Sequence, residues 1–153
     1  MGYTYITLTQ SKWQSSDYKV TLSSAMKIEQ YPLPKIADIF VFLNGGKKFS
    51  KIDLIQTYLQ REVDAASKSL LTINTHKGLF RFNRLPFGIV SAPANWQRAM
   101  DQILENISKL QCILDDMIIT GSTDKEHFET LSLVLRRLEH HGLRANLDLS
   151  LIH

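Results

Sequence analysis

Read from Lys48 onward, with the strands of residues 59–84 set aside as an insertion, the sequence predicts the order strand, helix, strand, strand, helix, strand. This order indicates an α+β fold of the split βαβ, ferredoxin-like type. The 153 residues suffice for about one domain, and contents of 44% hydrophobic and 22% charged residues are average for a globular protein. The composition therefore excludes a disordered, collagen-like or coiled-coil chain.

The first part of the chain leads into the predicted sheet through one helix. Residues 1–16 are rich in Thr, Ser and Tyr and predict either a strand or a loose tail. Residues 36–43 have apolar side chains at the spacing of one helix face, and the sequence Asn44-Gly45-Gly46 ends this helix. The apolar positions are Ile36, Ile39, Phe40 and Leu43. Residues 48–54 are then the first strand of the sheet.

The insertion is predicted to consist of strands. Residues 59–64 alternate between apolar and polar side chains, as a half-buried strand does. Residues 70–75 and 79–84 are two further strands, and the short turn His76-Lys77-Gly78 joins them into a hairpin. The sequence Leu85-Pro86-Phe87-Gly88 then interrupts the strand pattern.

Two helices and three strands complete the predicted fold. Ser91 caps a helix with one apolar side, formed by Trp96, Met100, Ile103, Leu104 and Ile107. Residues 110–114 and 117–120 are strands that Asp115-Asp116 joins as a two-residue turn. A capping box at residues 123–126 opens the second helix, and Gly142 ends it. Its predicted buried stripe is Phe128, Leu131, Val134, Leu135 and Leu138. Residues 143–149 form the last strand.

The predicted topology brings distant carboxylates together. In the split βαβ arrangement the first and third strands are neighbours at the centre of the sheet, so Asp53 meets Asp115 and Asp116 at one edge. Clustered carboxylates repel one another and require a cation. Hard oxygen ligands suit Mg²⁺, and two such ions about 4 Å apart support nucleotide transfer to a primer hydroxyl.

Turn chemistry is the ordinary alternative for Asp115-Asp116, because Asp tolerates unusual backbone angles in hairpins. The apolar strands on both sides favour the catalytic interpretation, since they place the pair at the edge of a core. The histidines have no second ligand at a useful spacing, so we assign them no metal role.

Charge and cysteine content narrow the class of protein further. The net charge is +3, with basic residues in excess over residues 1–100 and acidic ones in excess afterwards, which suggests phosphate contact by the first part. A single cysteine, Cys112, excludes a disulfide framework and a zinc cluster. Without a signal peptide or a long apolar run, we expect an intracellular protein, cytoplasmic or nuclear, with no membrane partner.

Several motifs resemble one family when taken in order. These are Phe49-Ser50-Lys51-Ile52-Asp53-Leu54, Tyr58, Leu85-Pro86-Phe87-Gly88, Ser91-Ala92-Pro93-Ala94, Gln97 and Leu114-Asp115-Asp116. Together they resemble the reverse transcriptase of gypsy-type LTR retrotransposons, which is one part of a pol polyprotein. The resemblance divides the chain into a divergent tail (1–16), a fingers and palm fragment (17–147) and a divergent end (148–153). The α+β, ferredoxin-like core would be the palm, and the inserted strands would be part of the fingers.

The resemblance implies a role for each matching residue. Asp53, Asp115 and Asp116 would be the catalytic, metal-binding carboxylates, with the Leu54 carbonyl as a further ligand. The cofactor would be Mg²⁺, two ions being expected and Mn²⁺ being possible. The partners would be an RNA or DNA template with its primer, a dNTP and, in intact relatives, the RNase H and integrase of the polyprotein. Residues that would contact nucleotide or template are Tyr58, Leu85, Pro86, Phe87, Gly88 and Gln97.

For some of these residues a simpler interpretation stays open. Tyr58 would be the aromatic gate that excludes a 2′-hydroxyl, but it is equally explained as a packed aromatic ring. A second set could contact the template–primer backbone, although solvated surface is the default for such side chains. This set is Lys47, Lys48, Lys51, Arg81 and Arg84.

The sequence also departs from the family. Ile113 stands where the acidic motif usually begins with an aromatic residue, and Trp13 stands where the family has a triphosphate-binding arginine. Relatives continue beyond this C-terminus into a thumb. We therefore expect an RNA-directed DNA polymerase fragment with weak or no activity alone. The alternative is a catalytically dead retrotransposon remnant that binds nucleic acid or serves as a scaffold.

Overall fold

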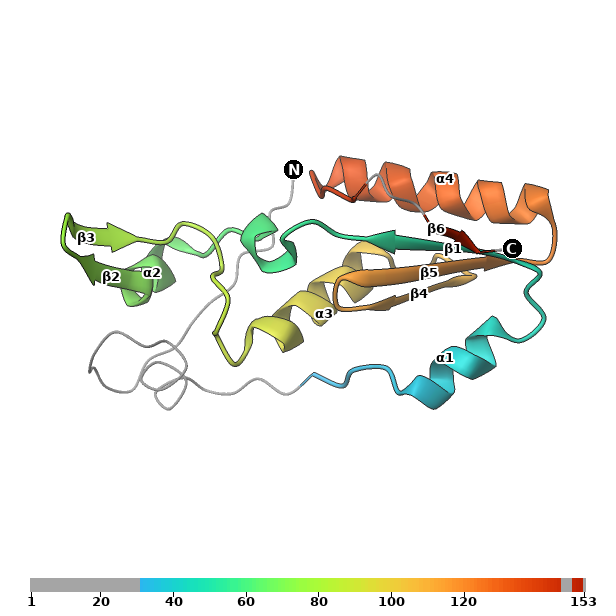
Figure 1. Ribbon diagram of the computed structural model, residues 1–153, viewed down its shortest axis with the longest axis horizontal. Helices are drawn as coiled ribbons and strands as arrows, with labels where there is room; N and C mark the ends of the chain where they lie inside the picture. The colour runs from blue at the N-terminus through green and yellow to red at the C-terminus, as the bar shows by residue number, and fades with distance from the viewer. Residues whose placement is uncertain (1–30, 147–149, 153) are drawn as a thin grey trace. The chain divides into compact units, whose positions relative to one another are not determined.

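The computed structural model describes residues 31–146 and 150–152 (Figure 1). The predicted tail of residues 1–16 and the position of Trp13 lie outside this range. The described residues belong to two compact units. One contains Gln56–Trp96, and the other contains Pro32–Ile55 together with the chain from Gln97 onward. No helix in this part of the chain combines the length and the apolar character needed to cross a membrane.

The unit of Pro32–Ile55 and the chain from Gln97 onward contains a four-stranded antiparallel sheet with the strand order β4-β5-β1-β6. Its elements follow the predicted order of the split βαβ fold, and the first and third strands of that fold, β1 and β5, are central neighbours as predicted. The bounds are β1 Lys48–Asp53, α3 Ala92–Ile103, β4 Leu110–Ile113, β5 Asp116–Gly121, α4 Asp124–His140 and β6 Ser150–Ile152.

Side chains along the central strands alternate between a buried face of the sheet and a more exposed one. Ile52 is buried and pairs with the buried Met117, and helix α4 packs along β5 on this unit (Figure 1). An Arg137 Nη1 donates a 2.8 Å hydrogen bond to the Ile103 carbonyl, which ties α4 to the end of α3. Because side chains alternate along a strand, Lys51 and Asp53 point to the other face.

Helix α1, Ile36–Leu43, has the predicted bounds. The Asp38 carboxylate accepts a hydrogen bond from the Lys35 N–H at its start, and Gly45 follows its end with a φ of +81°. The predicted apolar face is not fully buried, because Phe40 is 70% exposed. Helical spacing alone predicted the helix but could not tell which of its apolar side chains would be buried.

Short elements make up the Gln56–Trp96 unit. They are a 3-10 turn at Thr57–Gln60, α2 at Ala65–Lys68, a 3-10 turn at Ser69–Leu71, β2 at Thr72–Thr75 and β3 at Gly78–Arg81. The predicted hairpin is confirmed, with a tighter turn, since Thr75 pairs with Gly78. A small core of Val63, Leu71, Leu85, Ile89 and Ala92 holds the unit together.

The predicted strand at residues 59–64 is wrong. Gln56 adopts a left-handed backbone, with a φ of 46°, and directs the chain into the 3-10 turn. Asp64 then caps α2, because its Oδ1 accepts hydrogen bonds of 3.0 Å from the N–H groups of Ala66 and Ser67. A single bridge between Glu62 and Arg84 is what forms in place of the expected strand. The alternation of side chains was real, but local turn and cap geometry decided the backbone.

Helix α3 has the predicted apolar side, since Trp96, Met100, Ile103, Leu104 and Ile107 are all buried. The helix itself ends at Ile103, so the last two of these residues follow it. Ser91 directly precedes the helix as predicted, and its carbonyl accepts the Asn95 N–H at 3.0 Å. Its side chain does not cap the helix, because the hydroxyl is buried without a hydrogen-bond partner among the described residues.

Helix α4 begins and ends as predicted, and Val134 and Leu138 of the predicted stripe are buried, but the stripe differs in its first turn. The Thr123 hydroxyl accepts from the Glu126 N–H, and Gly142, with a φ of +67°, follows the helix end. His127 is buried, whereas Phe128 is 59% exposed and Leu135 is also exposed. A Cβ on Gly121 would lie 2.7 Å from the His127 backbone nitrogen. The glycine therefore lets the first turn of α4 approach β5 closely through His127, and this rotates Phe128 outward.

Only residues 143–146 of the predicted last strand, 143–149, lie within the described range. Within residues 143–146 the chain forms one isolated bridge, between Ala145 and Leu54, and residues 147–149 lie outside the described range. The strand that completes the sheet is β6, at Ser150–Ile152, which pairs with β1.

Candidate active site

The three predicted catalytic aspartates come together at one end of the central strand pair. Asp53 stands directly opposite Asp116 in the β1–β5 register, a position that places cross-strand Cβ atoms about 4.5–5.5 Å apart. The Leu54 N–H donates a 3.0 Å hydrogen bond to the Asp115 carbonyl. Residues far apart in the sequence thus meet where the topology predicts, two of them on strands and Asp115 on the short turn beside them.

The turn before these aspartates differs by one residue from its prediction. Ile113 pairs with Asp116, so Leu114 and Asp115 form the turn and Asp116 is the first residue of β5. Leu114 has a φ of +54°. Positive φ is unfavourable for a side chain with a Cβ, by about 1–2 kcal/mol, and glycine is the usual residue at such hairpin positions. The acidic motif therefore starts from a strained backbone.

Gln97 lies behind this turn on helix α3, in the same unit as the aspartates. Its side chain is completely buried. Its Oε1 accepts a 2.8 Å hydrogen bond from the Leu114 N–H, and its Nε2 donates to the Cys112 carbonyl and to Asp101 Oδ1, at 3.0 and 2.9 Å. Because the side chain is completely buried and these bonds use both groups of its amide, any role of Gln97 toward nucleotide acts through the turn.

Lys51 supplies a positive charge beside the aspartates. Its Nζ lies 2.9 Å from Asp116 Oδ1, and its position on β1 shares the sheet face of Asp53 and Asp116. The hydrogen bond with Asp116 raises the pKa of Lys51 despite partial desolvation, and the negative charges of Asp116, Asp53 and Asp115 raise it as well. One ammonium group therefore lies in the field of all three carboxylates. Both side chains of the ion pair are almost half exposed, so the pair itself contributes little to stability.

The carboxylate oxygens are of the kind that divalent cations such as Mg²⁺ prefer. Among the described residues no group of three or more His, Cys, Asp or Glu side chains is arranged so that it could hold a metal ion. The backbone nevertheless sets Asp53 opposite Asp116 and Asp115 next to them, and an ammonium group already occupies a cation position on Asp116. The carboxylate oxygens therefore suit a cation in their chemistry, but the side chains as they lie do not enclose one. The Leu54 carbonyl stays a predicted ligand.

A second group of predicted residues lies in the Gln56–Trp96 unit. The Tyr58 ring meets the Phe87 ring edge-to-face, with centroids 5.4 Å apart, and also contacts Trp96 at 6.4 Å. Leu85 and Pro86 are buried, whereas Phe87 is 58% exposed and Gly88 has a φ of +91°. Tyr58 is thus a packed aromatic, as the simpler interpretation holds. Its packing partner Phe87 is the side chain of the Leu85–Gly88 segment that faces solvent.

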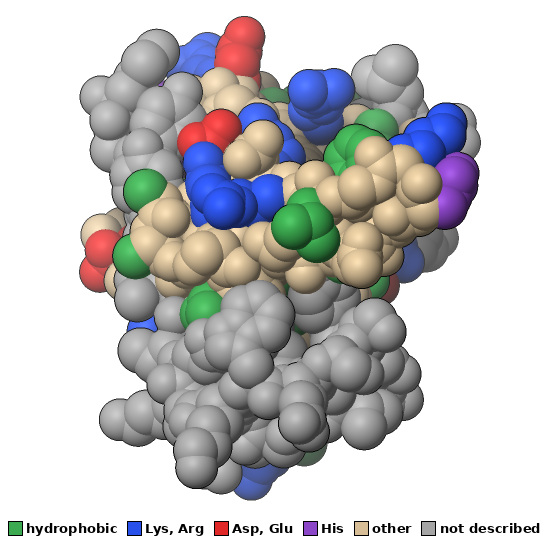
Figure 2. Space-filling view, turned by 90° about the vertical axis from the view of Figure 1, so that its left-hand side faces the viewer, with side chains coloured by type: hydrophobic (Ala, Val, Ile, Leu, Met, Phe, Trp, Pro, Cys, Tyr) green, Lys and Arg blue, Asp and Glu red, His purple; other side chains and the backbone are tan. Residues whose placement is uncertain are grey.

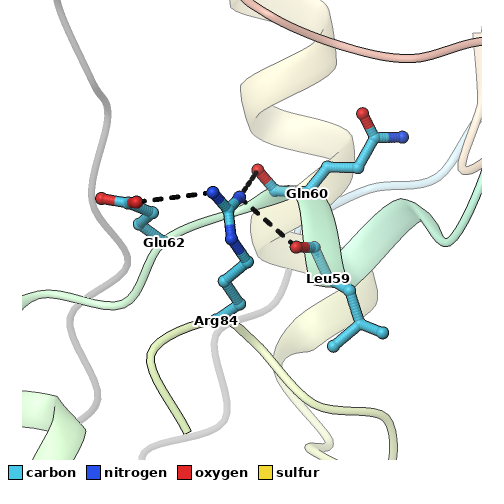
Figure 3. A network of polar contacts seen from close by, with 4 residues as sticks. All are labelled: Leu59, Gln60, Glu62 and Arg84. Carbon is cyan, nitrogen blue, oxygen red and sulfur yellow. Dashed lines mark hydrogen bonds and ion pairs between the residues drawn. The ribbon is translucent and has the colours of Figure 1, made fainter.

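Arg84 holds the turn that carries Tyr58 (Figure 3). Its Nη1 donates to the carbonyls of Gln60 and Leu59, at 3.0 and 3.5 Å, and its Nη2 lies 3.5 Å from Glu62 Oε1. The planar guanidinium suits such divided contacts. The structure gives Arg84 a role inside this unit, and the contact with nucleic acid that the resemblance implied for it stays a prediction.

Basic and apolar side chains share the surface at the hairpin end of this unit (Figure 2). Lys77 and Arg81 are exposed on β3 and its turn, and the exposed Leu79 and Phe80 lie between them. Interleaved cationic and aromatic side chains are the means by which proteins bind single-stranded nucleic acid.

Sequence reasoning missed two features of these units. The left-handed Leu114 leaves no signal in the sequence, because leucine does not favour positive φ. Arg61 is buried, and desolvation lowers its pKa. An arginine in an alternating segment would instead be expected at an exposed position.

Comparison of the sequence with known families gives one match over most of the chain. Residues 10–148 match the family described as reverse transcriptase (RNA-dependent DNA polymerase). An uncharacterised protein of Caenorhabditis elegans is 37% identical over 134 residues, and the Pol polyprotein from transposon 412 of Drosophila melanogaster, described as retrovirus-related, is 33% identical over 138. These alignments cover 87% and 88% of this chain but 10% and 11% of the relatives.

Solved structures show the same fold. A foamy viral protease-reverse transcriptase in complex with an RNA/DNA hybrid aligns with a TM-score of 0.79 and 22% identity, over 88% of this chain and 18% of that one. A second structure of that protein, in complex with double-stranded DNA, aligns with a TM-score of 0.81 and 22% identity, over 90% of this chain and 24% of that one.

Proposed function

Because the chain belongs to the reverse transcriptase family, we propose that it carries the polymerase centre of an RNA-directed DNA polymerase, with Asp53, Asp115 and Asp116 as its catalytic residues. The reaction joins the 3′-hydroxyl oxygen of a primer to the α-phosphorus of a dNTP and releases pyrophosphate. The observation that supports this most directly is the pairing of Asp53 with Asp116 beside the Leu114-Asp115 turn.

The proposed cofactor is Mg²⁺, as two ions, with Mn²⁺ as a substitute. Bound there, the cations would supply positive charge to the attacking and leaving oxygens of an in-line phosphoryl displacement. The chain's own contribution is to hold two carboxylates on paired strands and the third on the adjoining turn, and to balance them with Lys51 before a cation binds. The Lys51 ammonium then competes with a metal ion for Asp116, because both positive groups need the same oxygen.

The proposed substrates are a primed RNA or DNA template and a dNTP. The foamy viral relatives are complexes with an RNA/DNA hybrid and with double-stranded DNA. In this chain the exposed Lys77, Phe80 and Arg81 offer charge and an aromatic ring to nucleic acid. Tyr58 and Phe87 are the proposed contacts for the incoming nucleotide. Since the curated relatives include polyproteins far longer than this chain, further polyprotein domains are proposed partners.

The test is primer extension on an RNA template with Mg²⁺, together with Mn²⁺ binding to the same chain. We expect Asp115→Asn to lower synthesis by at least about 100-fold, as loss of a group that stabilises transition-state charge does, and to weaken Mn²⁺ binding. The matched control is Asp124→Asn, which removes an exposed carboxylate that pairs with Lys48 at the other end of β1. Equal Mn²⁺ binding by wild type, Asp115→Asn and Asp124→Asn would contradict the proposal.

A second candidate function is nucleic-acid binding without catalysis. The exposed basic and apolar side chains of the hairpin favour it, since they need no metal centre to bind a strand. Under this alternative the Asp115→Asn chain would bind template as well as wild type does, and aspartate-dependent synthesis would be absent from both.

A further inference from the structure

The turn that presents Asp115 is held from inside the protein at both polar atoms of Leu114. The Gln97 Oε1 accepts the Leu114 N–H at 2.8 Å, and the Cys112 thiol lies 3.7 Å from the Leu114 carbonyl. Because Leu114 and Asp115 are the whole connection between β4 and β5, fixing Leu114 restricts the backbone from which the Asp115 carboxylate extends.

The remaining contacts of Gln97 give its amide one orientation. Its Nε2 donates both to Asp101 on the same helix and to the carbonyl of Cys112 on β4. Strand β4 is an edge of the sheet, so one side of its backbone needs partners from outside the sheet. Gln97 supplies a donor for the strand and an acceptor for the turn, and an apolar side chain of the same size could supply neither.

The backbone of Leu114 is in a left-handed conformation, and the hydrogen bond from Leu114 to Gln97 explains why it persists. Its φ of +54° is one that leucine avoids, and residues held in such regions persist when the surrounding structure over-determines them. Functional turns are where this strain collects. Here the residue under strain directly precedes two of the proposed catalytic carboxylates.

We propose that Gln97 is a positioning residue, which holds Leu114 in the left-handed conformation and thereby sets Asp115 for cation binding. The role of Asp115 in cation binding rests on the proposed function, whereas the hydrogen bonds by which Gln97 holds Leu114 do not depend on it. It differs from a direct contact with nucleotide, because the Gln97 side chain is completely buried.

The experiment compares the full chain with Gln97→Met, Leu114→Gly and the double variant, measuring Leu114 amide exchange and Mn²⁺ affinity. Gln97→Met keeps the volume and removes the hydrogen bonds, so we expect faster Leu114 exchange and Mn²⁺ affinity weaker by about 10- to 100-fold, as for groups that orient metal ligands. Glycine adopts positive φ without strain. Adding Leu114→Gly to Gln97→Met should therefore restore most of the affinity.

Ile103→Val is the control for a purely structural role, since it weakens packing of the same buried helix without touching the turn. It should leave both measurements unchanged, and Leu114→Gly should give it no benefit. If Leu114→Gly fails to restore affinity to Gln97→Met, or if Gln97→Met leaves exchange and affinity as in wild type, the positioning role is wrong.

Two further variants keep the outcome unambiguous. If Gln97→Met does not fold, Leu114→Val strains the same turn with Gln97 intact, because branching at Cβ disfavours positive φ; unchanged Mn²⁺ affinity would then overturn the inference. Asp115→Asn tests the proposed function separately. If it binds Mn²⁺ as wild type does, the metal centre is wrong, while Leu114 exchange still reports on the clamp.

Discussion

In the unit that contains the sheet, Asp53 and Asp116 stand on two strands whose backbones pair continuously from Lys48 and Gly121 down to the aspartates. In the unit that contains the hairpin, Tyr58 and Phe87 stand on a 3-10 turn and on a loop, and their rings pack against each other. Strand pairing fixes position along a whole element, whereas a turn depends on a few side chains such as Arg84.

This difference matches the chemistry proposed for each region. Carboxylates that share a cation need positions set to within a fraction of an ångström, and sites built on strands are more exact than sites on loops. A pocket that accepts different bases gains from a surface that can adjust. We therefore expect substitutions in the sheet to change cation binding and substitutions at the turn that carries Tyr58 to change nucleotide binding.

The largest effect should come from the core under the aspartates. Met117 is fully buried and pairs with Ile52 between the acidic residues and the rest of β5. We expect Met117→Ala to destabilise the sheet unit by about 2–5 kcal/mol, through lost burial and a cavity, and to weaken Mn²⁺ binding with it. Chemical denaturation followed by Mn²⁺ titration measures both.

Leu71→Ala is the matched variant, because Leu71 is fully buried in the small core of the other unit. It should lower the protection of that unit's amides from hydrogen exchange while Mn²⁺ affinity stays near the wild-type value. If both variants reduce protection equally throughout the chain, the two units do not respond separately, which contradicts this prediction.

A smaller and more selective effect is expected at the turn that carries Tyr58. Arg84→Met removes the donors to the Gln60 and Leu59 carbonyls, with a cost of about 1 kcal/mol for a half-exposed group. The amide of Arg61, which bonds to the Tyr58 carbonyl, should exchange faster, and KM for dNTP should rise without a change in Mn²⁺ affinity. Arg84→Lys keeps the charge but not the divided geometry, so it should resemble Arg84→Met; wild-type behaviour of the lysine variant would show that charge alone suffices.

The same contrast explains how far the sequence could be interpreted. The apolar residues of the segments 48–54 and 117–120 predicted the central strands, and the topology then predicted that Asp53 meets Asp116, because long-range pairing follows the buried face. The strand expected at residues 59–64 was wrong because Gln56 and Asp64 impose local turn and cap geometry that alternation does not report. Period alone could not choose the buried side of α4, where the close approach at Gly121 places His127 inward.

Within the site, the carboxylates were predictable and their supports were not. Asp115 and Asp116 stand out as adjacent acids between apolar runs, and topology adds Asp53. The predicted turn was displaced by one residue because Leu114 accepts a strained φ that the buried amide of Gln97 stabilises. Such support involves a hydrogen bond between a helix and a turn far apart in sequence, and composition or spacing carries no trace of it.

The cap of α2 tests how strongly local geometry holds the hairpin unit. Burial raises the pKa of Asp64, but hydrogen bonds from Ser67 and from the Ala66 N–H outweigh it, so the pKa lies below the usual 3.8. A lowered folded-state pKa means that the stabilisation is present above the unfolded value and is lost as pH falls through the folded one. Asp64→Ala should cost about 1 kcal/mol at neutral pH, measured by denaturation at pH 7 and at acid pH.

Asp64→Asn separates the cap from its titration. Asparagine caps helices about as well as aspartate and does not titrate, so this variant should keep neutral-pH stability and lose the decline that Asp64 contributes in acid. A wild-type acid profile in Asp64→Asn would contradict the assignment.

The smallest effect is expected at the ion pair between Lys51 and Asp116 on the sheet. Lys51 neutralises Asp116 in the absence of a metal ion and competes with a bound one, so Lys51→Met should tighten Mn²⁺ binding. Because the pair is almost half exposed, the gain should stay within the 0–1 kcal/mol of surface pairs, up to about fivefold in affinity, and should shrink as salt is added. Lys48→Met removes the same charge from the far end of β1, where Lys48 pairs with Asp124, and should change affinity less. Weaker binding in Lys51→Met would mean that Lys51 supports the cation-bound state, and that the sheet positions a positive group for substrate as well as three negative ones for metal.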